Sequence, residues 1–298
     1  MPFIAILTAF MGPVFHGVSN IIDAHVAGKL FSRLTTVIFY NGLTNFLSIP
    51  FILYFGTPQA VPAEVIIYLL IINLIDVFYQ FPYYAALKKV DTSIVAAMFS
   101  LGKIIIPVLA YFMVDEKLQC SQYVGFFIVI LFNLFLNIQS PKNFHINIGF
   151  WLMLSVSLML SVQGVLYKKV LNEIDWVTAA FWCAIITNSF CLSFIILPKL
   201  RRGIITDFPV YRKRIKLFLV MELFDQLGHL PGKFALSLLP VVVLKAINAT
   251  QPLFVLLYGI ILYYCFGDRF KENVSRREVI KKLLCFVMII LGVVMVIG

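Results

Sequence analysis

Apolar stretches of membrane length follow one another along almost the whole chain. They cover about residues 2–22, 35–55, 65–87, 92–113, 122–139, 147–170, 176–197, 215–237, 240–265 and 280–298. A helix needs about 20 mostly apolar residues to cross the hydrocarbon core of a bilayer. With 61% hydrophobic and 13% charged residues, the chain differs from an ordinary soluble domain. The pattern predicts an all-α polytopic membrane protein with ten transmembrane helices, the first of them retained because no signal-peptide cleavage pattern precedes it.

A polar stripe interrupts one of these apolar segments. Glu222, Asp225, His229 and Lys233 are three, four and four residues apart, so a helix places them all on one face. An ionisable group at bilayer depth costs roughly 3 kcal/mol or more. We therefore expect this face to line a protein interior or a watery cavity, and we treat it as a functional-site hypothesis.

The same stripe recurs in the first half of the chain. An offset of 149 residues maps it onto Asn73, Asp76, Gln80 and Tyr84, and maps Pro231 onto Pro82. This indicates an internal repeat, with residues 1–140 and 141–298 as its two copies. Five helices in each copy would make the second copy enter the membrane from the opposite side. In inverted repeats the substrate site lies near the midplane between the copies.

Basic residues gather in alternate loops. The loops after the odd-numbered helices hold 18 Lys and Arg residues, and the opposite side holds only Lys117, Lys168 and Lys169. By the positive-inside rule, odd loops face the cytoplasm and both termini lie outside. The basic runs at 199–216 and 269–282 are expected to be loops that anchor this topology.

Several short motifs resemble the EamA-type drug/metabolite transporter superfamily. They are Glu116 with Gln122 and Gly125, the run Thr250-Gln251-Pro252-Leu253-Phe254, Gly267-Asp268, Leu291-Gly292-Val293, and the paired His16-Gly17-Val18 and Gln163-Gly164-Val165. The resemblance implies two inverted five-helix repeats and a transport function. Ten-helix members of this superfamily commonly have cytoplasmic termini, so the orientation and the direction of transport stay open.

Two lysines are candidates for binding substrate. Lys103 lies about ten residues into the fourth predicted helix, near mid-membrane. It either pairs with Asp76 and locks two helices together, or faces the cavity as a counter-charge for a carboxylate or phosphate. Lys245 lies near the start of the ninth helix, where it either extends to the interface or binds substrate with Asn248 and Gln251.

Glu222, Asp225 and His229 are the candidates for proton coupling. Two carboxylates one helical turn apart resist double ionisation, and histidine titrates near neutral pH. The alternative is a static network with Lys233 that holds the helix in place.

The remaining site residues complete a polar pocket with aromatic walls. The resemblance places His16 toward the centre of the protein, and Tyr40 and Trp182 belong to aromatic pairs at an offset of 142. The full predicted substrate set is His16, Tyr40, Asp76, Gln80, Tyr84, Lys103, Trp182, Lys245, Asn248 and Gln251.

These patterns predict a secondary active transporter of a small polar metabolite, working by alternating access with proton coupling or exchange. Mixed charge favours an amino acid, an amino-acid derivative or a nucleotide-like zwitterion or anion. The alternatives are a flippase for a lipid-linked head group and a non-transporting receptor. No nucleotide-binding loop, H-E-x-x-H or G-x-S-x-G occurs, and His16, His25, His145 and His229 are widely dispersed. We therefore expect no enzyme activity, cofactor or metal.

The expected partners are a small-molecule substrate and the lipid bilayer. The net charge of +10 lies mostly in loops, which argues against nucleic acid as a partner. Two fused repeats make a monomer sufficient, and a homodimer is the alternative. The expected location is the inner (plasma) membrane of the cell, as a multi-pass protein.

Overall fold

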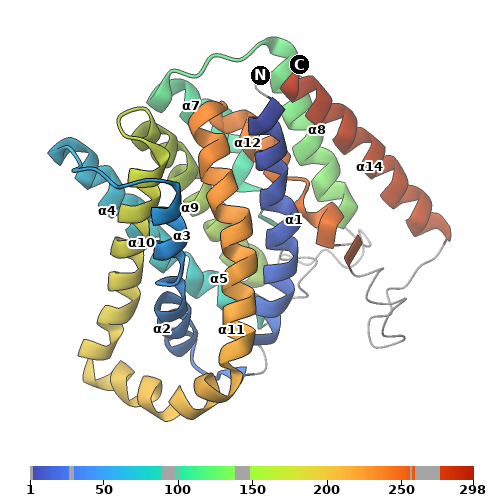
Figure 1. Ribbon diagram of the computed structural model, residues 1–298. Helices are drawn as coiled ribbons and strands as arrows, with labels where there is room; N and C mark the ends of the chain where they lie inside the picture. The colour runs from blue at the N-terminus through green and yellow to red at the C-terminus, as the bar shows by residue number, and fades with distance from the viewer. Residues whose placement is uncertain are drawn as a thin grey trace.

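The protein folds into a bundle of helices. A computed structural model describes residues 3–26, 30–88, 98–99, 101–137, 148–255, 257–258 and 276–298, and within these ranges it contains no strand (Figure 1). The helices are α1 (Phe3–His25), α2 (Leu34–Asn45), α3 (Ser48–Phe55), α4 (Ala63–Phe78), α5 (Gln80–Leu87), the 3-10 helix η2 (Gly102–Ile105), α7 (Ile106–Val114), α8 (Cys120–Asn137), α9 (Ile148–Leu171), α10 (Trp176–Ser193), the 3-10 helix η4 (Phe194–Ile196), α11 (Pro198–Leu238), α12 (Val241–Asn248) and α14 (Arg276–Ile297).

Five helical segments of the described chain are long and apolar enough to cross a membrane: Phe3–Asn20, Leu34–Phe55, Ala63–Leu87, Ile148–Leu171 and Trp176–Ile196. Two of the predicted helices are in fact pairs, because 35–55 divides into α2 and α3 and 65–87 divides into α4 and α5. Four shorter apolar helices lie between or after these segments. The chain is an integral, multi-pass membrane protein, as predicted.

The longest helix, α11, contradicts one sequence-based boundary. The sequence predicts a loop at 199–216 followed by a helix at 215–237, but α11 runs unbroken for 41 residues. At 1.5 Å per residue this is about 60 Å, twice the thickness of the hydrocarbon core. In Figure 1 its first part runs along the bottom of the bundle and then turns upward, and Pro209 lies inside this first part.

The first part of α11 is helical because it has a buried face. Ile204, Tyr211 and Phe218 recur every seven residues, and all three are buried. Tyr40 of α2 donates a hydrogen bond to the Ile204 carbonyl at 2.7 Å. Its ring also stacks on Tyr211, with centroids 4.2 Å apart. The basic side chains lie exposed around this buried face: Lys199, Arg201, Arg202, Arg212, Lys213, Arg214 and Lys216.

Both termini lie at the top of the bundle in Figure 1, opposite the basic first part of α11. An even number of crossings puts the two ends of a chain on one side of a membrane. Which side faces the cytoplasm stays a prediction.

The α8 and α14 helices approach closely through glycine. A Cβ atom added to Gly125 would lie 2.6 Å from the Gly292 carbonyl oxygen, and one added to Gly292 would lie 2.8 Å from the Gly125 carbonyl oxygen. Small residues are favoured where membrane helices touch through their backbones. Nearby, Gln122 of α8 donates to the Val296 carbonyl at 3.0 Å.

Buried apolar side chains form two main clusters. One includes Phe126 and Ile130 of α8 with Val243 of α12. The other includes Met153 of α9 and Phe218 of α11. Members of both clusters also line a cavity inside the bundle, where many polar side chains gather.

Candidate functional site

A cavity of about 370 Å³ lies inside the bundle. This falls within the usual size range of small-molecule sites, about 300–1,000 Å³. Helices from both halves of the chain contribute to its wall, among them α1, α4, α5, α9, α11 and α12. Its charged or titratable lining residues are His16, Asp23, Asp76, Lys103, Glu222, Asp225, His229, Lys233 and Lys245, together with the tyrosines Tyr79, Tyr83, Tyr84 and Tyr167 and the thiols of Cys183 and Cys191.

Eleven of the thirteen sequence-predicted site residues line this cavity. They are His16, Asp76, Gln80, Tyr84, Lys103, Glu222, Asp225, His229, Lys245, Asn248 and Gln251. The structure therefore brings residues of both polar stripes to one cavity, although Asn73 of the first stripe does not line it. The roles assigned to these side chains stay predictions.

Tyr40 and Trp182 do not line the cavity. The hydroxyl of Tyr40 bonds the backbone of α11, as described above. Trp182 donates from Nε1 to the Gln59 carbonyl at 3.1 Å. The expectation that these two rings wall the pocket was wrong, because each is fixed to backbone elsewhere.

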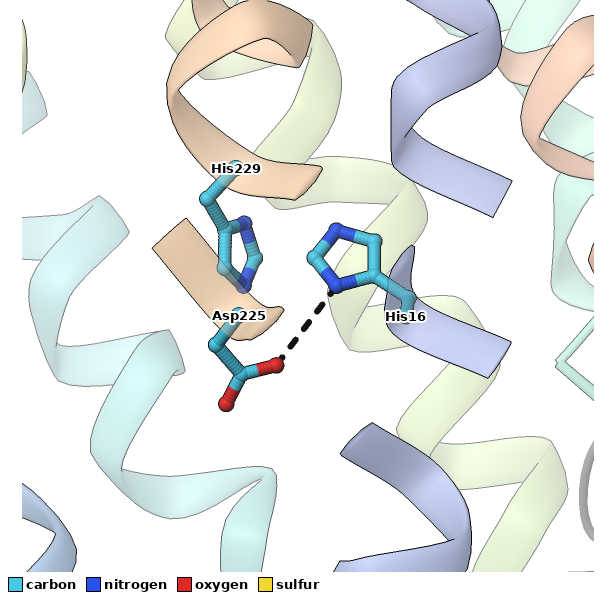
Figure 2. A group of neighbouring side chains, drawn as sticks. All are labelled: His16, Asp225 and His229. Atoms are coloured by element: carbon cyan, nitrogen blue, oxygen red, sulfur yellow. Dashed lines mark ion pairs between the residues drawn. The ribbon is translucent and has the colours of Figure 1, made fainter. Parts of the chain in front are cut away.

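Two histidines from different helices meet beside a carboxylate (Figure 2). The His16 and His229 ring centroids are 4.3 Å apart, and His16 Nδ1 lies 3.6 Å from Asp225 Oδ1. One ligand atom from each of the three residues lies within 4.8 Å of the others. The histidines were expected to be dispersed because they are far apart in the sequence. The fold instead brings His16 and His229 together.

Glycine makes this approach possible. A Cβ on Gly228 of α11 would lie 2.8 Å from His16 Cε1. That spacing is too short for real atoms, so a side chain at position 228 would displace the histidine. Close packing of α1 on α11 thus brings His16 to Asp225.

Asp76 bonds neutral partners. Gln163 Nε2 donates to its Oδ1 at 2.5 Å, and the Thr187 hydroxyl lies 3.5 Å from its Oδ2. Within the described ranges, no ion pair joins Asp76 to Lys103. The alternative in which those two residues only lock neighbouring helices therefore gains no support.

Lys245 lies inside the bundle. Its side chain packs against Gly164 of α9, where an added Cβ would lie 2.6 Å from Nζ. Lys233 of α11 lies nearby, with its Nζ 5.7 Å from the centroid of the Tyr167 ring. The lysine at 245 therefore faces the cavity and does not extend to the interface.

Asp23 is a cavity residue that the sequence analysis missed. It is buried, with 8% of its surface exposed. The Tyr84 hydroxyl donates to its Oδ1 at 3.1 Å, and the Tyr83 hydroxyl donates to its Oδ2 at 3.3 Å. The predicted first helix ended at residue 22, so Asp23 fell in an expected loop. The first helix in fact extends three residues further, to His25, and therefore includes Asp23.

Asn188 is a second missed residue. It lines the cavity and is fully buried, and neither its Nδ2 nor its Oδ1 has a hydrogen-bond partner among the described residues. Asn248 Oδ1 is also buried and has no hydrogen-bond partner among the described residues. Because buried polar groups are almost always hydrogen-bonded, these atoms call for a polar ligand or water in the cavity.

A clamp at one end of the bundle holds the turn between α11 and α12. Both oxygens of Glu116 accept the Val241 amide hydrogen, at 2.8 and 2.9 Å. Lys168 Nζ donates to the carbonyls of Leu236 and Leu239, at 2.8 and 2.9 Å. Burial raises the pKa of the Glu116 carboxyl, and the Val241 amide partly opposes this.

The structure so far defines a multi-pass membrane protein with a charged cavity in its interior. The sequence model of the EamA-like transporter family matches residues 3–138. That family is part of the drug/metabolite transporter superfamily, which the sequence motifs resemble.

Other comparisons concern the fold. No curated protein sequence matches this chain. Solved structures do match, 28 chains in all. One, titled "Crystal structure of protein", superposes with a TM-score of 0.62 over 98% of this chain and 95% of its own, at 14% identity. This shows a shared fold across nearly the whole chain.

Proposed function

We propose that this protein is a secondary active transporter of a small zwitterionic or anionic metabolite, located in the plasma membrane. Residues 1–140 and 141–298 act as two inverted five-helix repeats that alternate access to the cavity. Energy comes from a proton gradient or from exchange against a second metabolite, without enzyme activity. A monomer suffices, and a homodimer is compatible with the same mechanism.

One observation carries this proposal: the apolar bundle encloses a cavity that is lined by charges of both signs. Lysines and carboxylates at bilayer depth are costly and generally mark substrate or ion pathways. The unpartnered atoms of Asn188 and Asn248 add hydrogen-bonding capacity for a polar ligand. Lys103 and Lys245 disfavour a purely cationic substrate.

Eight cavity residues are proposed to bind substrate: His16, Asp76, Gln80, Tyr84, Lys103, Lys245, Asn248 and Gln251. Asp225, Glu222 and His229 are proposed to carry proton coupling. Asp225 lies beside His16, and Gln226 donates to Glu222 at 2.7 Å. A proton arriving at this group would change the charge of the cavity without any metal or cofactor.

The test is flux in reconstituted liposomes. Labelled amino acids, nucleotides and amines are offered with and without an inward proton gradient. Lys103→Ala should abolish anion or zwitterion flux, and Asp225→Asn should remove the proton-driven component. Lys117→Ala and Asp115→Asn are matched controls, because both side chains are exposed on the surface. Normal flux in both cavity variants would overturn the site assignment, and binding without flux would indicate a receptor.

A second candidate function is a flippase for a lipid-linked head group. An apolar groove of about 460 Å³ follows the other face of α11, lined by Phe51, Leu227 and Leu230 among others, and Gln226 lines both groove and cavity. An alkyl chain in this groove would let an attached head group reach the polar site. Leu227→Trp, which fills the groove, should block movement of a fluorescent lipid-linked substrate and leave soluble substrates unaffected.

A further inference from the structure

The group formed by His16, Asp225 and His229 combines two imidazoles with one carboxylate. Asp225 and His229 are four residues apart on α11, so they lie one turn apart on the same helical face. His16 faces them from α1, and all three side chains line the cavity. In Figure 2 they point toward one another. Two ligands one turn apart on a helix, completed by a third from another part of the chain, are a common way to hold a metal ion.

The spacing of the donor atoms fits a single ion. One donor atom from each residue lies within 4.8 Å of the other two, and His16 Nδ1 lies 3.6 Å from Asp225 Oδ1. Around a tetrahedral ion with bonds of about 2.0–2.2 Å, neighbouring donor atoms are about 3.3 Å apart. His16 and Asp225 are therefore almost at the required distance. His229 is the most exposed of the three side chains, so it has room for the small rotation that completes the set.

Gly228 fixes the position of the ligand from α1. A Cβ atom added to this glycine would lie 2.8 Å from Cε1, 2.9 Å from Nε2 and 3.0 Å from Nδ1 of His16. The whole edge of the imidazole therefore packs against the backbone of α11, at a position between Asp225 and His229 in the sequence. The missing side chain lets the third ligand approach the other two.

The charge of the group also favours a bound cation. In the described parts of the chain, Asp225 forms no ion pair with a lysine or arginine, and its ionic contact is with His16. A carboxylate inside an apolar bundle is costly unless a positive charge pairs with it. A divalent ion supplies that charge, and neutral imidazoles offer it their nitrogen lone pairs.

We propose that His16, Asp225 and His229 form a binding site for a divalent transition-metal ion of the Zn²⁺ type, with one coordination position open to the cavity. Imidazole nitrogen suits zinc and its neighbours in the first transition row, whereas Mg²⁺ and Ca²⁺ prefer oxygen ligands. Three protein ligands leave the fourth position of a tetrahedral ion to water or to a carboxylate or amine that enters the cavity. This inference goes beyond the proposed function, in which the same side chains carry protons without a metal.

The test is titration calorimetry with ZnCl₂ on the full chain in detergent. The protein is purified without a polyhistidine tag and is first stripped with a chelator that is then removed. Wild type should bind one Zn²⁺ per chain, and His16→Ala, His229→Ala and Asp225→Asn should each weaken binding by at least about tenfold. His25→Ala is the matched control and should leave the affinity unchanged, because this histidine lies on the same helix as His16, is exposed and does not line the cavity. A roughly hundredfold excess of Mg²⁺ should not displace the ion.

Co²⁺ provides a second readout, because its visible absorption reports the coordination of the bound ion. Acetate added to the Co²⁺-loaded protein should change this absorption by entering the open position, and an unchanged spectrum would contradict that position. Folded wild type that binds no Zn²⁺ overturns the metal site, whether or not any variant folds. Wild-type affinity in all three ligand variants, or an equal loss in His25→Ala, would place the ion elsewhere and overturn it as well.

Discussion

The clamp around the α11–α12 turn gives a prediction with a defined magnitude. Val241 is the first residue of α12. Glu116→Ala removes the side chain that accepts a hydrogen bond from its backbone amide. The residue before it, Pro240, offers no capping side chain. Losing a helix cap costs about 1 kcal/mol, and leaving a buried donor without a partner costs about 1–3 kcal/mol. Because Glu116 is only partly buried, we expect a loss of about 1–2 kcal/mol.

That loss should be visible in thermal unfolding in detergent. For a chain of this size, 1 kcal/mol corresponds to roughly 2–4 °C in Tm, so Glu116→Ala should melt about 2–8 °C below wild type at the same scan rate. Glu116→Gln keeps one acceptor for the amide and should lose less. The neighbouring Lys117→Ala is the control, since its side chain is exposed. The reasoning is refuted if Glu116→Ala and Lys117→Ala melt within 0.5 °C of each other.

The pH dependence of this clamp has a definite sign. Burial raises the pKa of Glu116 in the folded state, so the protonated carboxyl is favoured by folding. Its contribution to stability is full below the ordinary pKa of glutamate and is lost as pH rises through the raised folded value. The wild type should therefore lose stability relative to Glu116→Gln over that interval, and a gain would contradict the assignment.

Three further substitutions are expected to affect stability through single contacts. Gly102→Ala places a Cβ against the backbone of α9 and should cost about 1–3 kcal/mol by overpacking, measured by Tm. Tyr40→Phe loses the hydrogen bond to Ile204 and should cost about 1 kcal/mol with KM unchanged; a raised KM would restore Tyr40 to the substrate site. Asp175 caps the N-terminus of α10. Burial alone would raise the pKa of its carboxyl, but the hydrogen bonds from Thr178 and other nearby groups lower that pKa overall. Its contribution is present above the ordinary pKa of aspartate and is lost as pH falls through the lowered value, so Asp175→Ala should cost about 1 kcal/mol at pH 7 and less in acid.

The sequence predicts the membrane helices well where their signal is local. The predicted 147–170 is α9 (Ile148–Leu171), and 2–22 is most of α1. The prediction of a loop at 199–216 was wrong for a physical reason. Seven basic residues give this segment the composition of a loop, but a buried residue at every seventh position, from Ile204 to Phe218, stabilises it as a helix. A hydropathy average does not detect a narrow apolar face in a charged segment.

The candidate site likewise has one part that local sequence patterns predict and another part that they do not. The spacing from Glu222 to Lys233 predicts one helical face, and the structure places that whole face on the cavity. What packs opposite that face depends on how α1 and α11 align, which no local pattern encodes. For that reason His16 was placed only by resemblance, Asp23 was missed, and Tyr40 was assigned to a pocket it does not line.

The orientation of the bundle decides which end of the cavity faces the cytoplasm. The first part of α11 lies at the end of the bundle opposite both termini (Figure 1). Lys and Arg are favoured on the cytoplasmic side, so we expect the basic first part of α11 to face the cytoplasm. Cys120, which is exposed at the start of α8 near the termini, offers a direct test. In a variant with Cys183, Cys191, Cys265 and Cys285 replaced by alanine, an impermeant maleimide should label Cys120 in intact cells. Arg201→Cys in a background that also lacks Cys120 should react only after permeabilisation. The reverse pattern would show that the basic first part of α11 faces outward, against the positive-inside rule.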